Sequence, residues 1–185
     1  MNRWLCLLGV ALVLTGCAAT PTTYLTLAPM PGPTKPIALP PLAIAKVMMP
    51  AAIDRLYLTS ATGQTTLHVA DHARWAAPLD GEAQNTLADD LAQRLPDTTV
   101  LHPGDATPPR GTRLVSVNVT RFLPEHSQVV LNADWRIAAR HHHRTIAAGR
   151  DHIVILSADT PAARASAMSA ALGHLADHMV ARLNH

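Results

Sequence analysis

The second half of the chain alternates between apolar and polar side chains, the pattern of strands that bury one face. Valines occupy every second position in 115–119, and apolar residues alternate with polar ones again in 129–137. The run 152–156 is almost entirely apolar, so it is predicted to be a central strand. Because the loops between these runs are short, we expect an antiparallel meander with one buried face.

The first half predicts shorter strands and one helix. Strand-forming segments lie at 24–27, 42–48, 55–59, 65–70 and 98–101. Before the last of these, Pro78 opens a helix in which leucines recur every four residues, and Pro96 ends it. The proline- and glycine-containing segment 102–111 is predicted to be a loop.

A second helix is predicted near the end of the chain. Thr160 and Pro161 suit an N-cap and a first helical position, and an apolar stripe from Ala167 to Leu183 follows them. The order of elements predicts an α+β fold, with a mixed, largely antiparallel sheet and two main helices packed on one of its faces.

The N-terminus has the pattern of an export signal. Arg3 precedes the apolar run 4–14, which is well short of the roughly 20 residues that a membrane-spanning helix needs. A basic start followed by a short apolar run is typical of a signal peptide. We therefore expect residues 1–16 to be a signal peptide.

The end of this run, "LTGC", resembles a bacterial lipobox and finishes at Cys17. Its small residues suit peptidase cleavage before the cysteine, and a thiolate is the nucleophile that thioether formation requires. We therefore expect Cys17 to carry diacylglyceryl and palmitate chains, which would anchor the mature chain without a spanning helix. Ala18, rather than Asp, follows the cysteine and indicates the outer membrane.

The segment 17–41 is rich in Pro, Thr and Ala and is predicted to be an extended tether, with a short strand near 24–28. Residues 42–185 are then sufficient for a single α+β domain. Cys6 would leave with the signal peptide and Cys17 would be acylated. No thiol would remain for disulfides, metal ligation or catalysis.

Charge and motif content exclude several functions. The formal net charge is only +2 and the cations are scattered, which argues against nucleic-acid binding. No set of nucleophile, base and oxyanion donor is recognisable, so neither an enzyme nor a cofactor is predicted. The pair Asp89-Asp90 is interpreted as a solvated helix face, and Asp54-Arg55 as a salt bridge in a turn.

Two histidine groups raise the question of a metal. In 141–143 three histidines are adjacent, and neighbouring residues of a strand point to opposite faces, so a solvated turn is favoured over a metal site. His174 and His178 share a helix face, but Asp177 is expected to point away from both. This pair is interpreted as a polar helix edge, and no metal is predicted.

The stretch "RWAAPL" at 74–79 is the most distinctive internal motif. Its tryptophan, just before a helix opened by proline, either closes onto the sheet as a hydrophobic staple or presents an anchor to a partner. Together with the earlier Asp-Arg pair, this motif supplies the candidate partner-binding or structural residues, which are Asp54, Arg55, Arg74, Trp75, Pro78 and Leu79.

An ordered set of motifs follows the lipobox: "YLTL" at 24–27, "IAKV" at 44–47, "IDR" at 53–55, "RWAAPL" at 74–79 and "VVLNADW" at 129–135. This set resembles the ABC-type transport auxiliary lipoprotein family, the family of paraquat-inducible protein C. The resemblance spans nearly the whole mature chain.

The resemblance implies a lipoprotein on the periplasmic face of the outer membrane. It would be an accessory subunit that docks an MCE-domain protein, which works with an ABC permease and ATPase in phospholipid transport and membrane integrity. A homo-oligomeric ring and contact with phospholipid are compatible with that role. Two alternatives stay open, an assembly or pilotin-type lipoprotein of an outer-membrane complex and a ligand- or metal-binding lipoprotein.

Overall fold

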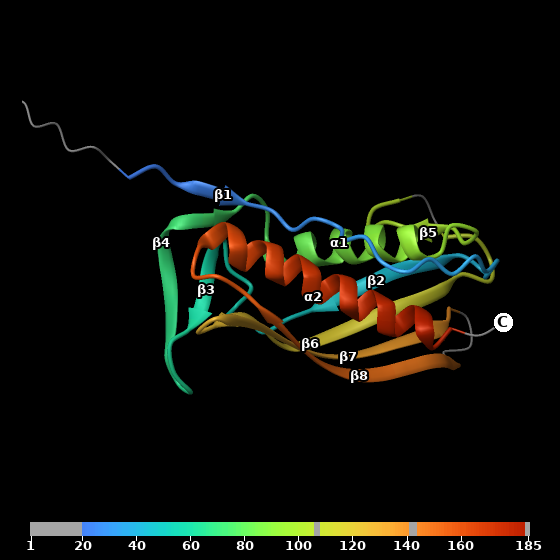
Figure 1. Cartoon of the computed structure of the whole chain (residues 1–185). Coiled ribbons are helices and arrows are strands. Elements are labelled where there is room, and N and C mark those ends of the chain that lie inside the picture. The colour runs from blue at the N-terminus through green and yellow to red at the C-terminus, as the bar shows by residue number, and fades with distance from the viewer. Residues whose placement is uncertain (1–19, 106–107, 141–143, 184–185) are drawn as a thin grey trace, which may run out of the picture.

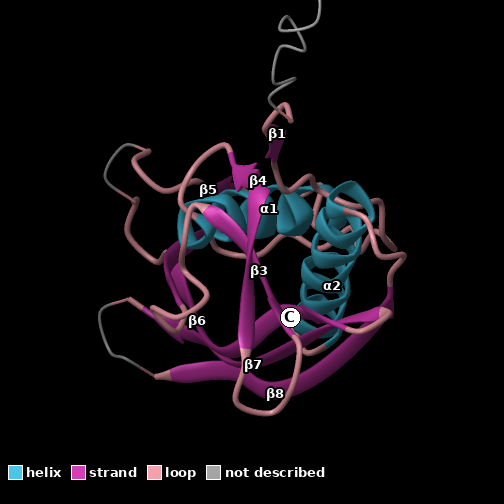
Figure 2. Ribbon diagram, turned by 90° about the vertical axis from the view of Figure 1, so that its left-hand side faces the viewer, coloured by secondary structure: helices cyan, strands magenta, loops and turns pink. Residues whose placement is uncertain are grey.

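The computed structural model describes residues 20–105, 108–140 and 144–183. Two helices, α1 (Leu79–Arg94) and α2 (Pro161–Ala181), cover one face of a curved eight-stranded mixed sheet (Figures 1 and 2). The strands are β1 (Thr23–Leu25), β2 (Leu42–Met48), β3 (Tyr57–Ala61), β4 (Leu67–Trp75), β5 (Val100–Leu101), β6 (Arg113–Glu125), β7 (Gln128–Ala139) and β8 (Thr145–Leu156). The predicted α+β class is therefore confirmed.

The predicted antiparallel meander consists of β6, β7 and β8. In register, Val115 lies opposite Ile137, and Trp135 lies opposite Gly149. The turn between β6 and β7 contains His126 at φ 51°, a conformation that few residues other than glycine adopt. These two antiparallel ladders are the longest in a sheet whose other pairings are mostly parallel.

The prediction that 152–156 forms a central strand is wrong. Among the described strands, β8 pairs with β7 alone and therefore lies at the edge of the sheet, with Leu156 82% exposed. The middle position of the meander belongs to β7, which has partners on both sides. A short apolar run does not distinguish a central strand from an edge strand, because the difference depends on which other segments pair with it.

The long strand β6 joins two parts of the sheet. Near its start it pairs in parallel with β2, and its last residue, Glu125, lies opposite Ala61 of β3. The strand β3 pairs with β4, which in turn pairs with β1. These three strands turn away from the main sheet and close one end of the molecule (Figure 1, left). Because β4 extends to residue 75, two residues of the 74–79 motif belong to a strand.

The proline-rich segment differs from the expected free tether. From β1 onward it runs across the helices (Figure 1, blue), and its side chains Leu25, Leu27 and Ile37 are buried in the core. The packed chain thus begins near residue 24 rather than at the predicted boundary of 42. In the part of the chain described, neither helix combines the length and hydropathy that crossing a bilayer requires.

Candidate functional site

Most residues singled out from the sequence lie at one end of the molecule. There β1, the turn 50–57 and the segment 67–80 meet, and we call these residues the anchor end. The amide of Trp75 donates to the carbonyl of Leu56 at 2.7 Å, and the amide of Ala76 donates to the carbonyl of Leu25 at 2.7 Å. These bonds bring together three segments that are distant in the sequence.

Asp54 and Arg55 do not form the predicted salt bridge. The carboxylate of Asp54 accepts the amide of Asp80 at 3.2 Å, and Arg55 Nε donates to the carbonyl of Ala52 at 3.1 Å. The N-cap residue of α1, Pro78, makes no side-chain capping bond. Asp54 therefore satisfies a free amide of the first helical turn from a distant loop, and its negative charge is favourable at that terminus.

Trp75 and Leu79 point into the core, and each is only 2% exposed. Trp75 also lies opposite Leu25 of β1, so the first described strand packs beside it. Both side chains stabilise the packing of α1 against the sheet to which β4 belongs. Of the two interpretations of the tryptophan, its burial favours the structural one.

Arg74, in contrast, is half-buried, with its Nε lacking a hydrogen-bond partner among the described residues, in a row whose other members are exposed. It lies opposite Tyr24 of β1 on one side and opposite Tyr57 of β3 on the other. Its guanidinium carbon is 4.9 Å from the centroid of the Tyr57 ring, a cation–π geometry. We call these three residues the Tyr–Arg row. Tyrosine and arginine both combine an apolar body with a polar tip, which suits a membrane–water interface.

The anchor end also concentrates exposed apolar side chains. Among the residues described, eight large hydrophobic side chains are exposed, and five belong to this end: Tyr24, Leu56, Tyr57, Leu67 and Val69. Single exposed hydrophobic residues are common on proteins, but a concentration at one end indicates a contact surface.

Behind the anchor end, the segment 26–35 crosses both helices, and we call it the strap. As an extended segment without a paired strand, it needs other acceptors for its amides. The amide of Leu27 donates to Glu82 at 3.1 Å, that of Ala28 to Ser169 at 3.1 Å, and that of Met30 to Asp90 at 2.8 Å. Side chains from α1 and α2 therefore hold the strap in place.

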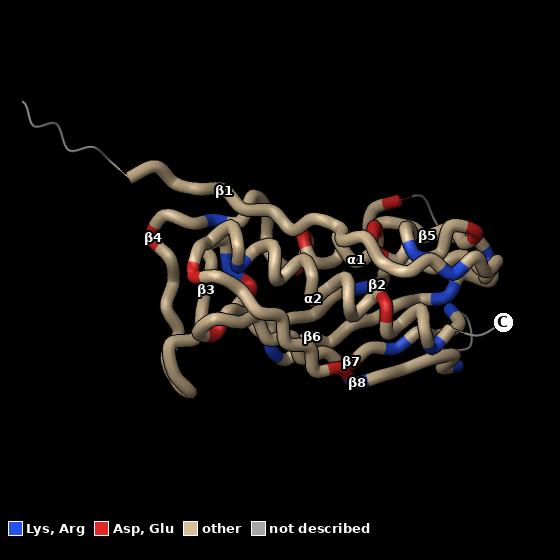
Figure 3. The backbone as a smooth tube through the Cα atoms, in the orientation of Figure 1, with Lys and Arg blue, Asp and Glu red and all other residues tan. Residues whose placement is uncertain are grey.

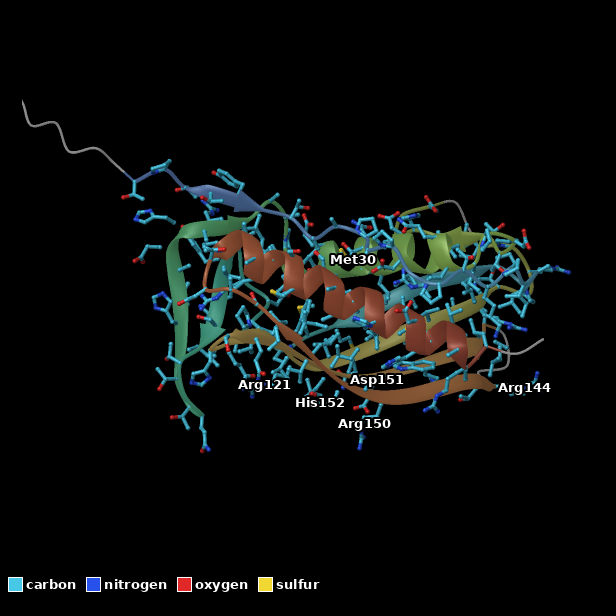
Figure 4. The ribbon with its side chains drawn as sticks, viewed as in Figure 1. Met30, Arg121, Arg144, Arg150, Asp151 and His152 are labelled. Atoms are coloured by element: carbon cyan, nitrogen blue, oxygen red, sulfur yellow. The ribbon has the colours of Figure 1, made fainter. Side chains whose placement is uncertain are left out.

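An ion network centred on the buried Arg94 contacts the strap at Met30, the strap residue labelled in Figure 4. Arg94 is 1% exposed and contacts Asp177 of α2 at 2.5 Å and Asp90 at 3.1 Å. It also donates to the carbonyl of Met30 at 3.0 Å. Gly32 lies so close that a Cβ atom there would overlap the guanidinium group of Arg94. We call Asp90, Arg94 and Asp177 the strap network.

Burial raises the pKa of Asp90 to about 6, although the amide of Met30 and the charge of Arg94 both oppose this shift. The prediction of a solvated helix face at Asp89-Asp90 is therefore wrong for Asp90, which is fully buried. The sequence contained one usable signal, since Arg94 follows Asp90 by four residues and shares its helix face.

The histidine pair of α2 makes separate contacts. His178 lies 2.7 Å from the carboxylate of Asp151, and His174 lies 3.7 Å from that of Asp177. The expectation that Asp177 points away from both histidines is therefore wrong for His174. No cluster of three metal-ligating side chains occurs within the described ranges. Cys17 and the histidines 141–143 lie outside them, so their roles stay predictions.

Comparison with known proteins identifies the relationship. The model of the family described as "ABC-type transport auxiliary lipoprotein component" matches residues 24–180. A search of curated proteins found no match. An uncharacterized protein of known crystal structure aligns over 89% of this chain and 100% of its own, with 17% identity and a TM-score of 0.74. A Xanthomonas campestris protein of family DUF330 aligns over 87% and 93%, with 18% identity and a TM-score of 0.66. At these identities the two structures support the fold alone.

Proposed function

Because the chain belongs to the family of ABC-type transport auxiliary lipoprotein components, we propose that it is a non-catalytic accessory subunit anchored by acyl chains on Cys17 in the outer membrane. The observation that carries this proposal is the family match over 24–180, which includes the strap, both helices and nearly all strands. The domain would face the periplasm.

We further propose that the transport system is of the MCE type and moves phospholipid between membranes. In this system the domain acts by docking the MCE-domain protein rather than by chemistry. The motif order of the sequence supports this finer assignment. A lipid-anchored domain with a firmly bound strap is well suited to docking, because Asp90 and Arg94 of the strap network bind Met30 and so keep the strap attached to the helices.

The short distance between Cys17 and the domain supports a close membrane contact. The six residues from Cys17 to β1 can span at most about 22 Å when fully extended. The anchor end would therefore lie beside the lipid headgroups. There the Tyr–Arg row would place its aromatic rings and guanidinium group at the level where such side chains are favoured.

Labelling with radioactive palmitate and membrane fractionation of the full chain test the anchor. In a Cys17→Ala variant we expect the label to be lost and the protein to leave the outer-membrane fraction. A Cys6→Ala variant is the matched control and should keep both properties. Palmitate labelling and outer-membrane sedimentation that persist in the Cys17→Ala variant would refute the lipidation assignment.

Affinity purification of the full chain from detergent-solubilised membranes tests the transport role. We expect co-purification of an MCE-domain protein, and we expect deletion of the protein to raise detergent sensitivity. Co-purification of an outer-membrane barrel or secretin in place of the MCE-domain protein would support an assembly role and contradict the proposal.

A further inference from the structure

The end of the molecule opposite the anchor end carries a group of arginines. Figure 3 shows Lys and Arg concentrated there, and Arg144 marks the position in Figure 4. Four of these residues lie near the start of β6, the end of β7 and the start of β8. We call them the distal arginine cluster: Arg110, Arg113, Arg140 and Arg144.

Backbone contacts bring Arg140 and Arg144 close to the start of β6, which Arg110 precedes by three residues. The amide of Arg140 donates to the carbonyl of Thr112 at 3.2 Å, and the carbonyl of Arg144 accepts the amide of Ala139 at 3.0 Å. The side chain of Arg140 reaches across to the carbonyl of Pro108 at 2.8 Å. The cluster therefore combines residues from three segments on a framework of strand ends.

The cluster has no carboxylate partners among the described residues. Among the described residues, the arginines that form ion pairs are Arg94, Arg121, Arg150 and Arg164, none of which belongs to the cluster. Within the cluster, Nη1 of Arg113 is buried without a hydrogen-bond partner. Burial and the neighbouring charge of Arg144 both lower the pKa of Arg113. The free protein thus contains like charges whose repulsion no described side chain relieves.

The location of the cluster argues against the anchoring membrane as its partner. The strand β6 runs from the cluster toward the anchor end, and its 13 residues correspond to roughly 40 Å. The chain between Cys17 and β1 spans at most about 22 Å. If the anchor end lies at the membrane, the cluster points away from the bilayer that holds the protein.

We propose that the distal arginine cluster docks an acidic, Asp- or Glu-rich segment of the periplasmic transport partner. Carboxylates would neutralise the clustered guanidinium groups, and arginine suits them because its planar donors bind a carboxylate in bidentate fashion. This inference deepens the proposed function by naming the docking surface and the chemistry of its partner. It rests on the proposed function for the orientation of the domain and for the existence of the transport partner.

Fluorescence anisotropy with a fluorescein-labelled hexaglutamate peptide tests the surface. The assay uses the full lipidated chain in a non-ionic detergent at low ionic strength, where exposed charges are least screened. The exposed pair Arg110→Gln/Arg144→Gln should weaken binding about tenfold, as two surface ion pairs would. The matched control is Lys46→Gln/Arg150→Gln, which removes the same charge from exposed sites elsewhere and should change binding less than about twofold.

Equal weakening in both double variants, or absence of peptide binding by the unmodified protein, would overturn the proposal. A second arm tests a membrane partner, with the protein anchored in phosphatidylcholine vesicles and phosphatidylglycerol vesicles added. Vesicle bridging that requires the cluster, without peptide binding, would assign the surface to a membrane and contradict a protein partner. The peptide assay needs no transport component, so its outcome is distinguishable from failure of the lipidation or co-purification experiments.

Discussion

Arg94 of the strap network and Arg113 of the distal arginine cluster are both withdrawn from water, but their charges are compensated differently. Arg94 is almost fully buried and has two carboxylate partners. Arg113 is partly buried, and none of the described ion pairs includes it. Breaking a compensated buried pair is costly, because it leaves an uncompensated buried charge, whereas removing a partly buried cation that has no carboxylate partner costs little. The comparison separates an arginine that holds the fold together from arginines available to a partner.

The largest expected effect is at Arg94. An Arg94→Met variant would leave the buried carboxylate of Asp90 and the partly buried carboxylate of Asp177 without their cation. We expect the unfolding free energy to fall by about 3–5 kcal/mol, measured by urea denaturation. An Arg150→Met variant, at an exposed site, should change it by less than about 0.5 kcal/mol. Similar losses in the two variants would show that the burial of Arg94 does not decide its contribution.

The next largest effect is a pH dependence of the unfolding free energy, caused by the titration of Asp90. Its pKa in the folded protein is raised from 3.8 to about 6, so the folded state binds a proton more tightly than the unfolded state. The Asp90 contribution to stability is therefore present at low pH and is lost as pH rises from about 4 to about 6, by up to about 3 kcal/mol.

An Asp90→Asn variant keeps an oxygen acceptor for the amide of Met30 but does not titrate. Its unfolding free energy should therefore lack that decline when denaturation is repeated across this pH range. Parallel pH profiles for the variant and the unmodified protein would contradict the assignment to Asp90.

A smaller loss is expected at Gly32, where the strap passes over Arg94. A Gly32→Ala variant would place a methyl group against the guanidinium and displace either the strap or the network, at a cost of about 1–3 kcal/mol. Gly63→Ala is the matched control, because a Cβ atom at that position would have no neighbouring atom within 4 Å. Thermal denaturation should give a lower melting temperature for the Gly32 variant than for the Gly63 variant. Equal melting temperatures would contradict the close packing of Gly32 against Arg94.

The smallest effect is predicted for Arg113. An Arg113→Met variant keeps most of the apolar stem and removes the buried Nη1 that lacks a partner. We expect a change within about 1 kcal/mol, which includes a gain in stability. A loss as large as that of the Arg94 variant would erase the distinction between the two regions.

Individual segments show where sequence patterns are sufficient to predict the structure. Alternation in 115–119 and 129–137 correctly predicts the strands of the meander, because which face of a strand is buried depends on a local period of two. Thr160 caps α2 as predicted, with its side chain accepting the amide of Ala163 at 3.2 Å. These features depend on residues only a few positions apart.

The sequence by itself determined the fold class, the start of the last helix, the family and the prediction of an acylated Cys17. The tertiary structure decided that β8 lies at the sheet edge, that the strap belongs to the domain, and that Asp90 is buried. Each of these depends on contacts between residues far apart in the chain, such as Asp90 with Met30 and Arg94 with Asp177. Local periodicity does not encode such contacts, because a helix face that is polar in sequence can still be covered by a segment from elsewhere.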